Sequence, residues 1–451
     1  MSAQEQQLPQ EIFDNVIDHF HADFHTLRNC ALVSPSWLSS ARAHLFHRIS
    51  LNPPKNTQTI GPTVFFFLRT RTSPCKRLLD CLESSTNTRL GSFAGYIREM
   101  HLCEGMLARE WLAHEAMLPP LLRTLHNLRR FEISRSASVR IPWGQLSHEL
   151  KAALEEHVLR LPSLTEIKLG SVMFDHLEDL AKMLRACRHL RVLDVDHIMF
   201  ADEGVESLRD LEGNFVKVSL DTLVVGPRTS TALMVYILHP SSAIAVNTVR
   251  KLSMSISGNF ADFARLLHGS ISVEHLELVL MNDVVLQDYW KPSAMGQFDL
   301  SRVPHLRNLK VNIDVLQQTD DPLQWLSALL LTGVDSSHPT RRNAIQTIWV
   351  VYSLYLPAPY MDRSANTTIF ERWSDIDAIL SGEEPSEDFD PGREDKHLHA
   401  YENLENVKLD FMLENPIGFG VAPRFLKEVV LDSPRLEKRH VLRVNAFDTS
   451  K

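Results

Sequence analysis

The residues best suited to chemistry in this sequence are three histidines, His19, His21 and His25, which lie close to Asp18 and Asp23. Imidazole nitrogens and carboxylate oxygens are ligands that zinc accepts in proteins. The histidines fall at the end of an expected helix and in the loop after it, whereas a metal site needs convergent ligands held by ordered neighbours. We therefore predict solvated histidines here and no metal site.

Motifs that carry catalytic chemistry are absent from the sequence. It contains no phosphate-binding GxxxxGKS/T or GxGxxG loop, no HExxH zinc pair, no GxSxG nucleophile and no CxxC pair. Carboxylates are numerous, but no spacing marks two of them as an acid–base pair. We expect a protein that works by binding, without a cofactor, and not an enzyme.

Composition narrows the class of partner. With 47 basic and 56 acidic residues the net charge is -9, which gives no overall attraction for nucleic acid or anionic lipid. A nucleic-acid interface would rest only on the local basic residues Arg69, Arg71, Lys76 and Arg77. The apolar runs are too short to span a membrane, and no secretory signal is visible. Five scattered cysteines fit reduced thiols, so we expect a cytoplasmic or nuclear protein.

Three short amphipathic patterns fill the beginning of the chain. Apolar residues recur at helical spacing over residues 8–20, where Pro9 suits the first turn of a helix. Asp23 can cap a second helix, and Ser34 can cap a third helix that has Pro35 at its first position. Because a unit of this size is too small to bury all its apolar faces, we expect it to contact another surface.

This segment resembles the F-box motif. The resemblance rests on the order and spacing of Leu8-Pro9-x-Glu11-Ile12, Val16-Ile17, Asp23-Phe24, Leu27-Arg28 and Leu32-Val33-Ser34-x-x-Trp37. Phe20, where a leucine is usual, is a conservative departure. The resemblance implies that the helices dock the Skp-type adaptor of cullin-based ubiquitin ligases. By position, the implied contact residues are Leu8, Pro9, Ile12, Val16, Leu27, Val33 and Trp37.

Spacing alone does not reveal which partner an apolar face meets. The alternative is that these helices pack against the rest of the chain and cap it.

A short phrase returns along the rest of the chain: an apolar residue, two of any type, an apolar residue, one of any type, and a third apolar residue. Five copies begin with leucine and carry a charged residue between the last two apolar positions, where chance predicts about one or two. These copies begin at Leu128, Leu164, Leu190, Leu306 and Leu404. Looser copies begin at residues 97, 220, 249, 273, 345 and 426.

The phrase has the period of a strand, because its last two apolar residues share one face of a pleated chain. Segments with helical period lie between copies, over residues 174–184, 260–267, 323–330 and 373–380. Strand, return helix, strand is the pattern of a parallel sheet with helices on one face, stacked into a curved solenoid. We therefore expect an α/β fold in which residues 97–102, 128–133, 164–169, 190–195, 306–311 and 404–409 are neighbouring parallel strands.

The pattern resembles the degenerate leucine-rich repeats of fungal F-box proteins. Its units run from 22 residues (404 to 426) to 59 (345 to 404), against about 20–29 in the family. The family's asparagine is replaced by Ser136, Val172, Ile198 and Asp314. We expect a helical module over 1–48, a partly helical connector over 49–96 and an irregular solenoid over 97–451. An acidic insertion near 381–400 is expected to be a solvated loop.

In each expected strand the residue between the two core positions faces away from the core. These residues are Glu132, Lys168, Asp194, Val224, Ser253, Glu277, Lys310, Trp349, Lys408 and Val430. Their charges alternate, which does not suit a phosphate backbone. Because interface hot spots are enriched in tryptophan, we predict a substrate contact at Trp349, flanked by Lys310 and Lys408. The alternative is that the protein's own chain covers Trp349.

With the resemblance, these features lead us to expect the substrate-recognition subunit of a cullin-type (SCF) ubiquitin ligase. The N-terminal helices would bind the Skp-type adaptor and, through it, a cullin, and the repeats would bind a protein substrate that the sequence does not identify. The alternative is a repeat-domain interaction scaffold that acts outside ubiquitin transfer.

Overall fold

The computed structural model describes residues 9–53, 73–86, 93–105, 110–135, 140–202, 216–256, 260–280, 298–315, 322–333, 344–355, 373–381, 401–414, 430 and 433–448. The chain folds as two compact units, residues 1–218 and 219–451. Each unit is an α/β structure built on parallel strands. The acidic insertion lies outside the described residues, except for Ser381.

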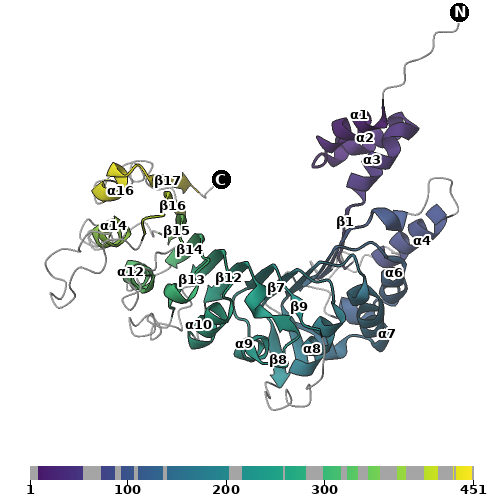
Figure 1. The fold of residues 1–451 in the computed structure, drawn as a ribbon. Coiled ribbons are helices and arrows are strands. Elements are labelled where there is room, and N and C mark those ends of the chain that lie inside the picture. The colour runs from purple at the N-terminus through teal and green to yellow at the C-terminus, as the bar shows by residue number, and fades with distance from the viewer. Residues whose placement is uncertain are drawn as a thin grey trace, which may run out of the picture. The chain divides into compact units, whose positions relative to one another are not determined.

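Unit 1 begins with three helices, α1 (Gln10–Asp18), α2 (Phe24–Val33) and α3 (Pro35–Leu45), as predicted (Figure 1). Asp23 caps α2, since its Oδ1 accepts the N–H groups of His25 and Thr26, each at 3.1 Å. The Ser34 hydroxyl accepts the N–H of Ser36 at 3.3 Å, and Pro35 is the first residue of α3. Pro9 stands one residue before α1 and not inside its first turn.

The main sheet of unit 1 contains five parallel strands among the described residues, in the order β1 (Arg48–Leu51), β2 (Glu99–Glu104), β3 (Arg130–Arg135), β5 (Glu166–Gly170) and β7 (Val192–Asp196). Their register aligns Ile49, Met100, Phe131, Ile167 and Leu193 in one row. Three shorter strands, β4 (Ile141–Pro142), β6 (Val172–His176) and β8 (Met199–Asp202), form a second parallel sheet. The short strand β9 (Val218–Ser219) lies at the unit boundary.

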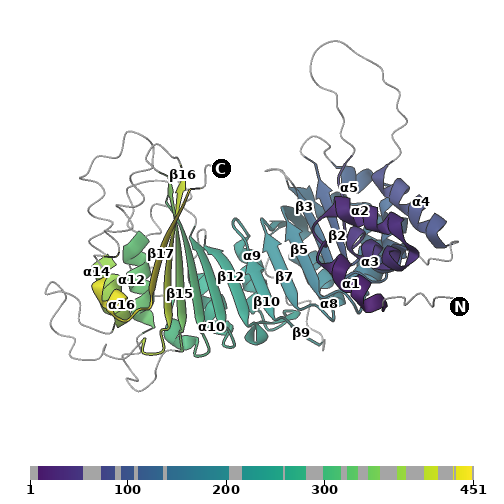
Figure 2. The ribbon, with the colours of Figure 1, turned by 90° about the horizontal axis from the view of Figure 1, so that it is seen from above.

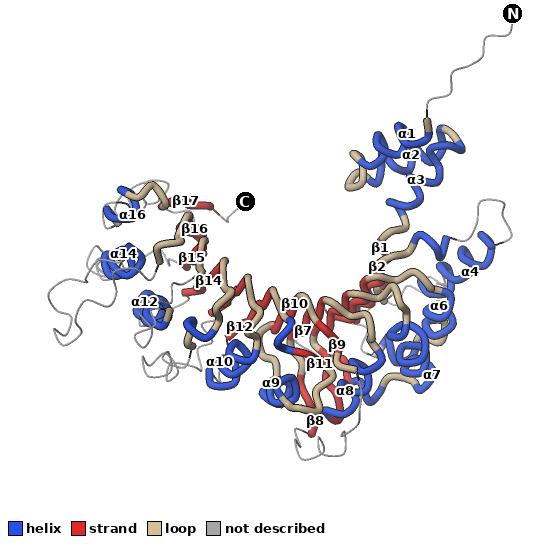
Figure 3. The backbone as a smooth tube through the Cα atoms, viewed as in Figure 1, coloured by secondary structure: helices blue, strands red, loops and turns tan. Residues whose placement is uncertain are grey.

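Helical segments connect the strands of unit 1 (Figure 3). They are α4 (Pro74–Thr86), η1 (Phe93–Tyr96), α5 (Trp111–His114), α6 (Leu118–Thr124), η2 (Trp143–Gln145), α7 (His148–Ala152), η3 (Ala153–His157), η4 (Val158–Arg160) and α8 (Leu177–Ala186). The predicted return helix over 174–184 is α8, with Phe174 in β6 instead. The buried carboxylate of Glu104, at the end of β2, accepts the N–H groups of Trp111 and Leu112 at 2.7 and 3.0 Å and so caps α5.

Unit 2 repeats one strand–helix unit. Its parallel strands follow chain order: β10 (Thr222–Val225), β12 (Lys251–Ile256), β13 (His275–Leu280), β14 (Asn308–Val315), β15 (Thr347–Tyr355), β16 (Asn406–Glu414) and β17 (Leu442–Asp448). The intervening helices are α9 (Thr231–Leu238), α10 (Phe260–Gly269), α12 (Pro322–Thr332), α14 (Trp373–Ser381) and α16 (Pro434–Lys438). Short segments β11 (Ile244–Ala245), η6 (Val246–Thr248) and η8 (Leu300–Arg302) complete the unit. All five helices lie on one face of the unit's sheet, and the other face carries none of the described helices (Figures 1 and 2).

The six segments predicted as parallel strands are β2, β3, β5, β7, β14 and β16, each beginning about two residues after the first apolar residue of its phrase. That first residue precedes the strand and is buried in every case, as at Leu128, Leu306 and Leu404. In unit 2 the looser copies at 220, 249, 273 and 345 are strands too.

Two expectations need correction. The connector expected over 49–96 contains the first strand, β1, which pairs with β2. The phrase is present there as well, since Phe46, Ile49 and Leu51 have its spacing.

The second correction concerns the copy at 426–431. Of this copy only Val430 lies within the described residues, and it is helical. The strand that pairs with β16 on the side away from β15 is β17. The register aligns Val407 with Leu442, so Arg439 stands before β17 where Leu404 stands before β16. Its guanidinium donates to the carbonyl oxygens of Leu380 and Tyr401 at 3.0 and 3.5 Å, and a search for apolar residues misses this strand.

Candidate partner-binding surfaces

The N-terminal helical module, residues 9–45, has a small core. Its fully covered side chains are Ile17, Leu27, Cys30 and Ala41, with Ala31, Trp37 and Leu45 packed against them. Polar contacts join α1 to α3: Gln10 donates to the Ser36 carbonyl at 2.7 Å, and His44 lies 2.7 Å from Asp18. The Ser40 hydroxyl also donates to Asp14.

Several large apolar side chains of the same module are left exposed by the described residues. Leu32 is 85% exposed, Val33 68% and Phe24 56%. Ile12, Val16 and Phe20 are exposed as well, along and just beyond α1. A single exposed leucine needs no explanation, but a group of large apolar side chains on a small module marks an interaction site.

The predicted adaptor contacts divide between this surface and the core. Pro9, Ile12, Val16 and Val33 are exposed. Trp37 is half-buried, with its ring 5.9 Å from that of Phe13.

Leu27 has no exposed surface, so the structure places it in the core and not on a contact face. Leu8 lies outside the described residues. Sequence reasoning left out Phe24 and Leu32, although both belong to the quoted motif and Leu32 adjoins Val33.

The module joins the rest of unit 1 at the end of α3. The Arg42 guanidinium lies 4.6 Å from the centre of the Phe93 ring, and the Phe46 ring lies 4.9 Å from the same ring. These contacts use the face of α3 toward η1, while the apolar surface of α1 and α2 stays uncovered by the described residues.

A second candidate surface is the helix-free face of the unit 2 sheet. The register places Ser253, Glu277, Lys310, Trp349 and Lys408 side by side across successive strands. Trp349 is half-buried, so the part of the chain described here does not cover it completely. The corresponding residues of unit 1, Glu132, Lys168 and Asp194, lie in an ion-pair ladder, where Lys168 meets Asp194 at 3.2 Å.

Trp349 is held by its neighbours. The Lys310 and Lys408 ammonium groups, one from each flanking strand, lie 4.6 and 4.1 Å from the centre of its ring. The indole N–H donates to Asp410 at 2.8 Å, and Lys408 pairs with the same carboxylate oxygen at 2.7 Å. The two lysines therefore flank Trp349 as the sequence placed them, but they occupy ring surface that a partner would otherwise use.

Two carboxyl groups anchor this face. Burial alone would raise the pKa of Glu277, but hydrogen bonds from Lys310 and Asn312, each at 2.8 Å, together with Ser253, outweigh burial and lower it. Burial of Asp410 is likewise outweighed by hydrogen bonds from Lys408, Asn445 and Trp349, so its pKa also lies below the ordinary value. Both groups are charged at neutral pH and tie neighbouring strands together.

Histidines and basic residues give no further site within the described residues. No group of three or more histidine, cysteine, aspartate or glutamate side chains there is placed to hold a metal ion. Lys76 and Arg77 are exposed on α4, whereas Arg69 and Arg71 lie outside the described part of the chain. None of the helices described is long and apolar enough to cross a membrane.

Comparison with protein families and with curated proteins yields no relative of this chain. No protein-family model matches the chain, and no curated protein does either.

Proposed function

We propose that this chain is the substrate-recognition subunit of a cullin-type (SCF) ubiquitin ligase, acting in the cytoplasm or nucleus without an activity of its own. The N-terminal module would be an F-box that binds the Skp-type adaptor. The strand–helix units would be an irregular leucine-rich-repeat-like solenoid that binds a protein substrate.

One observation carries the proposal: the module has a core of its own yet exposes Phe24, Leu32 and Val33. These side chains lie in the segment whose sequence resembles an F-box. If the helices served only to cap the chain, their apolar face would be the natural face to cover. The contacts that join the module to η1 instead come from Arg42 and Phe46, near the end of α3.

The proposal is tested by affinity purification of the full chain and of the Leu32→Lys, Val33→Lys variant, with co-purifying proteins identified by mass spectrometry. Lysine suits the last turn of α2 because it complements the helix dipole. Ile271 is 51% exposed in unit 2, so Ile271→Lys is a matched control.

We expect an adaptor and a cullin with the wild type and the control, and neither with the double variant. Recovery of the adaptor with the double variant would contradict the proposal. So would a wild-type purification that contains no adaptor.

A further inference from the structure

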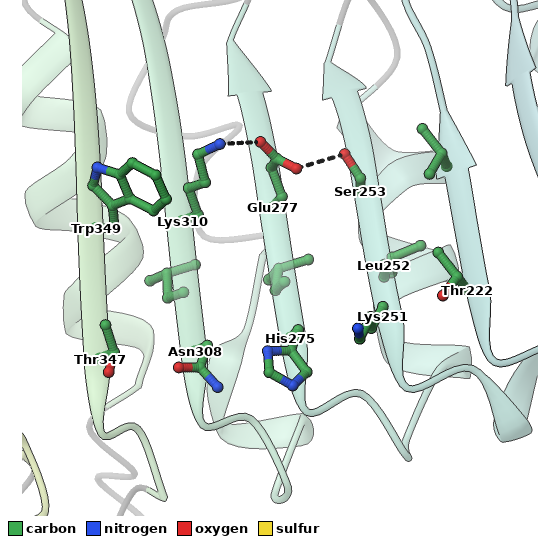
Figure 4. Close-up of a pocket in the computed structure, with 13 residues that line it drawn as sticks. Thr222, Lys251, Leu252, Ser253, His275, Glu277, Asn308, Lys310, Thr347 and Trp349 are labelled. Carbon is green, nitrogen blue, oxygen red and sulfur yellow. Dashed lines mark hydrogen bonds and ion pairs between the residues drawn. The ribbon is translucent and has the colours of Figure 1, made fainter. Parts of the chain in front are cut away.

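A groove of about 430 Å3 crosses the helix-free face of unit 2 over strands β10 and β12–β15 (Figure 4). Two rows of side chains line it. The first row contains Ser253, Glu277, Lys310 and Trp349, and the second contains Thr222, Lys251, His275, Asn308 and Thr347. Each row follows the sheet register, so its members are neighbours on adjacent strands.

The side chains of the first row contact one another and their neighbours. Lys310 pairs with Glu277 at 2.8 Å, Ser253 donates to the same carboxylate at 3.3 Å, and Trp349 is held as described above. Among the described residues that line the groove, Glu277 is the only carboxylate, and its charge is neutralised by Lys310. The polar side chains of this row therefore already have partners within the chain.

The second row differs from the first in its polar contacts. Within the described residues, the side chains of Lys251, His275, Asn308 and Thr347 make no hydrogen bond or ion pair. Lys251 and His275 are adjacent in register and both exposed. As far as the described residues show, the row contains hydrogen-bond donors and an unpaired cation but no acid, in a chain whose net charge is -9.

We infer that this groove binds an extended, acidic segment of a partner protein, whose carboxylates meet Lys251 and His275. Charge complementarity selects the occupant, since an unpaired ammonium and an adjacent imidazole favour carboxylates and disfavour basic segments. The two rows are two residues apart along each strand, or about 7 Å, which is too narrow for a helix about 10 Å wide. Five strands spaced by about 4.8 Å span about 19 Å, which matches about six extended residues.

The inference deepens the proposed function by naming a class of substrate, and as a statement about substrates it rests on that function. Binding to the groove is nevertheless measurable without the adaptor. The two ideas can therefore fail separately.

The experiment measures fluorescence anisotropy of a labelled peptide of alternating glutamate and threonine, about eight residues long so that it exceeds the groove, with the purified full chain. Peptides with glutamine or lysine in place of glutamate are run beside it, as is a single-stranded oligonucleotide. The variants are Lys251→Glu and the milder Lys251→Gln. The control is Lys182→Glu, an exposed lysine on helix α8.

We expect the glutamate peptide to bind, the glutamine and lysine peptides to bind more weakly, and added salt to weaken binding. Lys251→Glu should weaken binding about tenfold, Lys251→Gln less, and Lys182→Glu should leave it unchanged. Circular dichroism of each variant establishes that it is folded. The inference is overturned if folded Lys251→Gln and Lys251→Glu variants bind as wild type, if glutamate and glutamine peptides bind equally, or if the oligonucleotide binds more tightly than the peptide.

Discussion

At the scale of single residues, the helix-free face of unit 2 is organised by Asp410 and Glu277. Glu277 accepts hydrogen bonds from lysine and asparagine side chains of the neighbouring strand β14. Asp410 accepts them from Trp349 and Asn445 in the two neighbouring strands and from Lys408 in its own strand. The side chain of Asp410 is 4% exposed. A charge that is so well covered stabilises the fold only while its partners are in place.

Asp410→Asn should therefore lower the free energy of unfolding at neutral pH by about 1–3 kcal/mol, because three donors lose a charged acceptor. Since the folded pKa of Asp410 is lowered, its contribution is present above the ordinary carboxyl pKa and is lost as pH falls through the folded value. The unfolding free energies of wild type and variant, measured with urea and circular dichroism, should differ at pH 7 and converge progressively as pH falls below about 4 and through the folded pKa of Asp410. The exposed Asp80→Asn is the control. A difference that is independent of pH would contradict the assignment.

At the scale of elements, strand β17 forms although Arg439 replaces the first apolar residue of its repeat. It stands three residues before β17, where other repeats have a buried leucine, and donates to the carbonyl oxygen of Leu380 in the last turn of α14, where helix carbonyls lack partners. At this position β17 is held by the charge-assisted hydrogen bond of Arg439 in place of apolar packing.

Arg439→Ala should loosen β17 and the end of α14. We expect a loss of about 1–3 kcal/mol and faster amide hydrogen exchange over 442–448, with β12 and β13 unchanged. Arg443→Ala, an exposed arginine in the same strand, should leave exchange near the wild-type rate. Equal exchange in both variants would show that Arg439 does not hold the strand.

The sequence predicted most of these elements but not the chemistry of their surfaces. The repeated phrase placed six strands and four return helices because apolar spacing determines which side faces the core. It could not show that Leu27 is covered while Leu32 is exposed, since both lie on one short helix and only the packing of α1 and α3 decides between them. The sequence placed Lys310 and Lys408 beside Trp349, but it could not show that their ammonium groups lie over its ring, because that depends on side-chain conformations set by the ion pairs with Glu277 and Asp410.

At the scale of the whole molecule, the first strand belongs to the unit 1 sheet and not to the helical module. A chain that begins at residue 46 keeps Phe46 and β1, whereas one that begins at residue 53 exposes the edge of β2. We expect the first truncation to unfold near the wild-type temperature and the second at a clearly lower one, with aggregation. Thermal unfolding by circular dichroism and light scattering measures both. Cooperative unfolding caused by loss of residues 1–45 alone would favour the capping alternative.

The proposal that the N-terminal module binds an adaptor is tested most directly by measuring, with calorimetry, the binding of the purified full chain to a purified Skp-type adaptor. We predict a one-to-one complex that the Leu32→Lys, Val33→Lys double variant weakens by at least about a hundredfold, because charged groups replace the most exposed apolar side chains of the module. Ile271→Lys should bind as the wild type, and both variants should unfold at the wild-type temperature. Absence of a complex, or equal affinity for the wild type and the double variant, would contradict the assignment of this module as the adaptor-binding site.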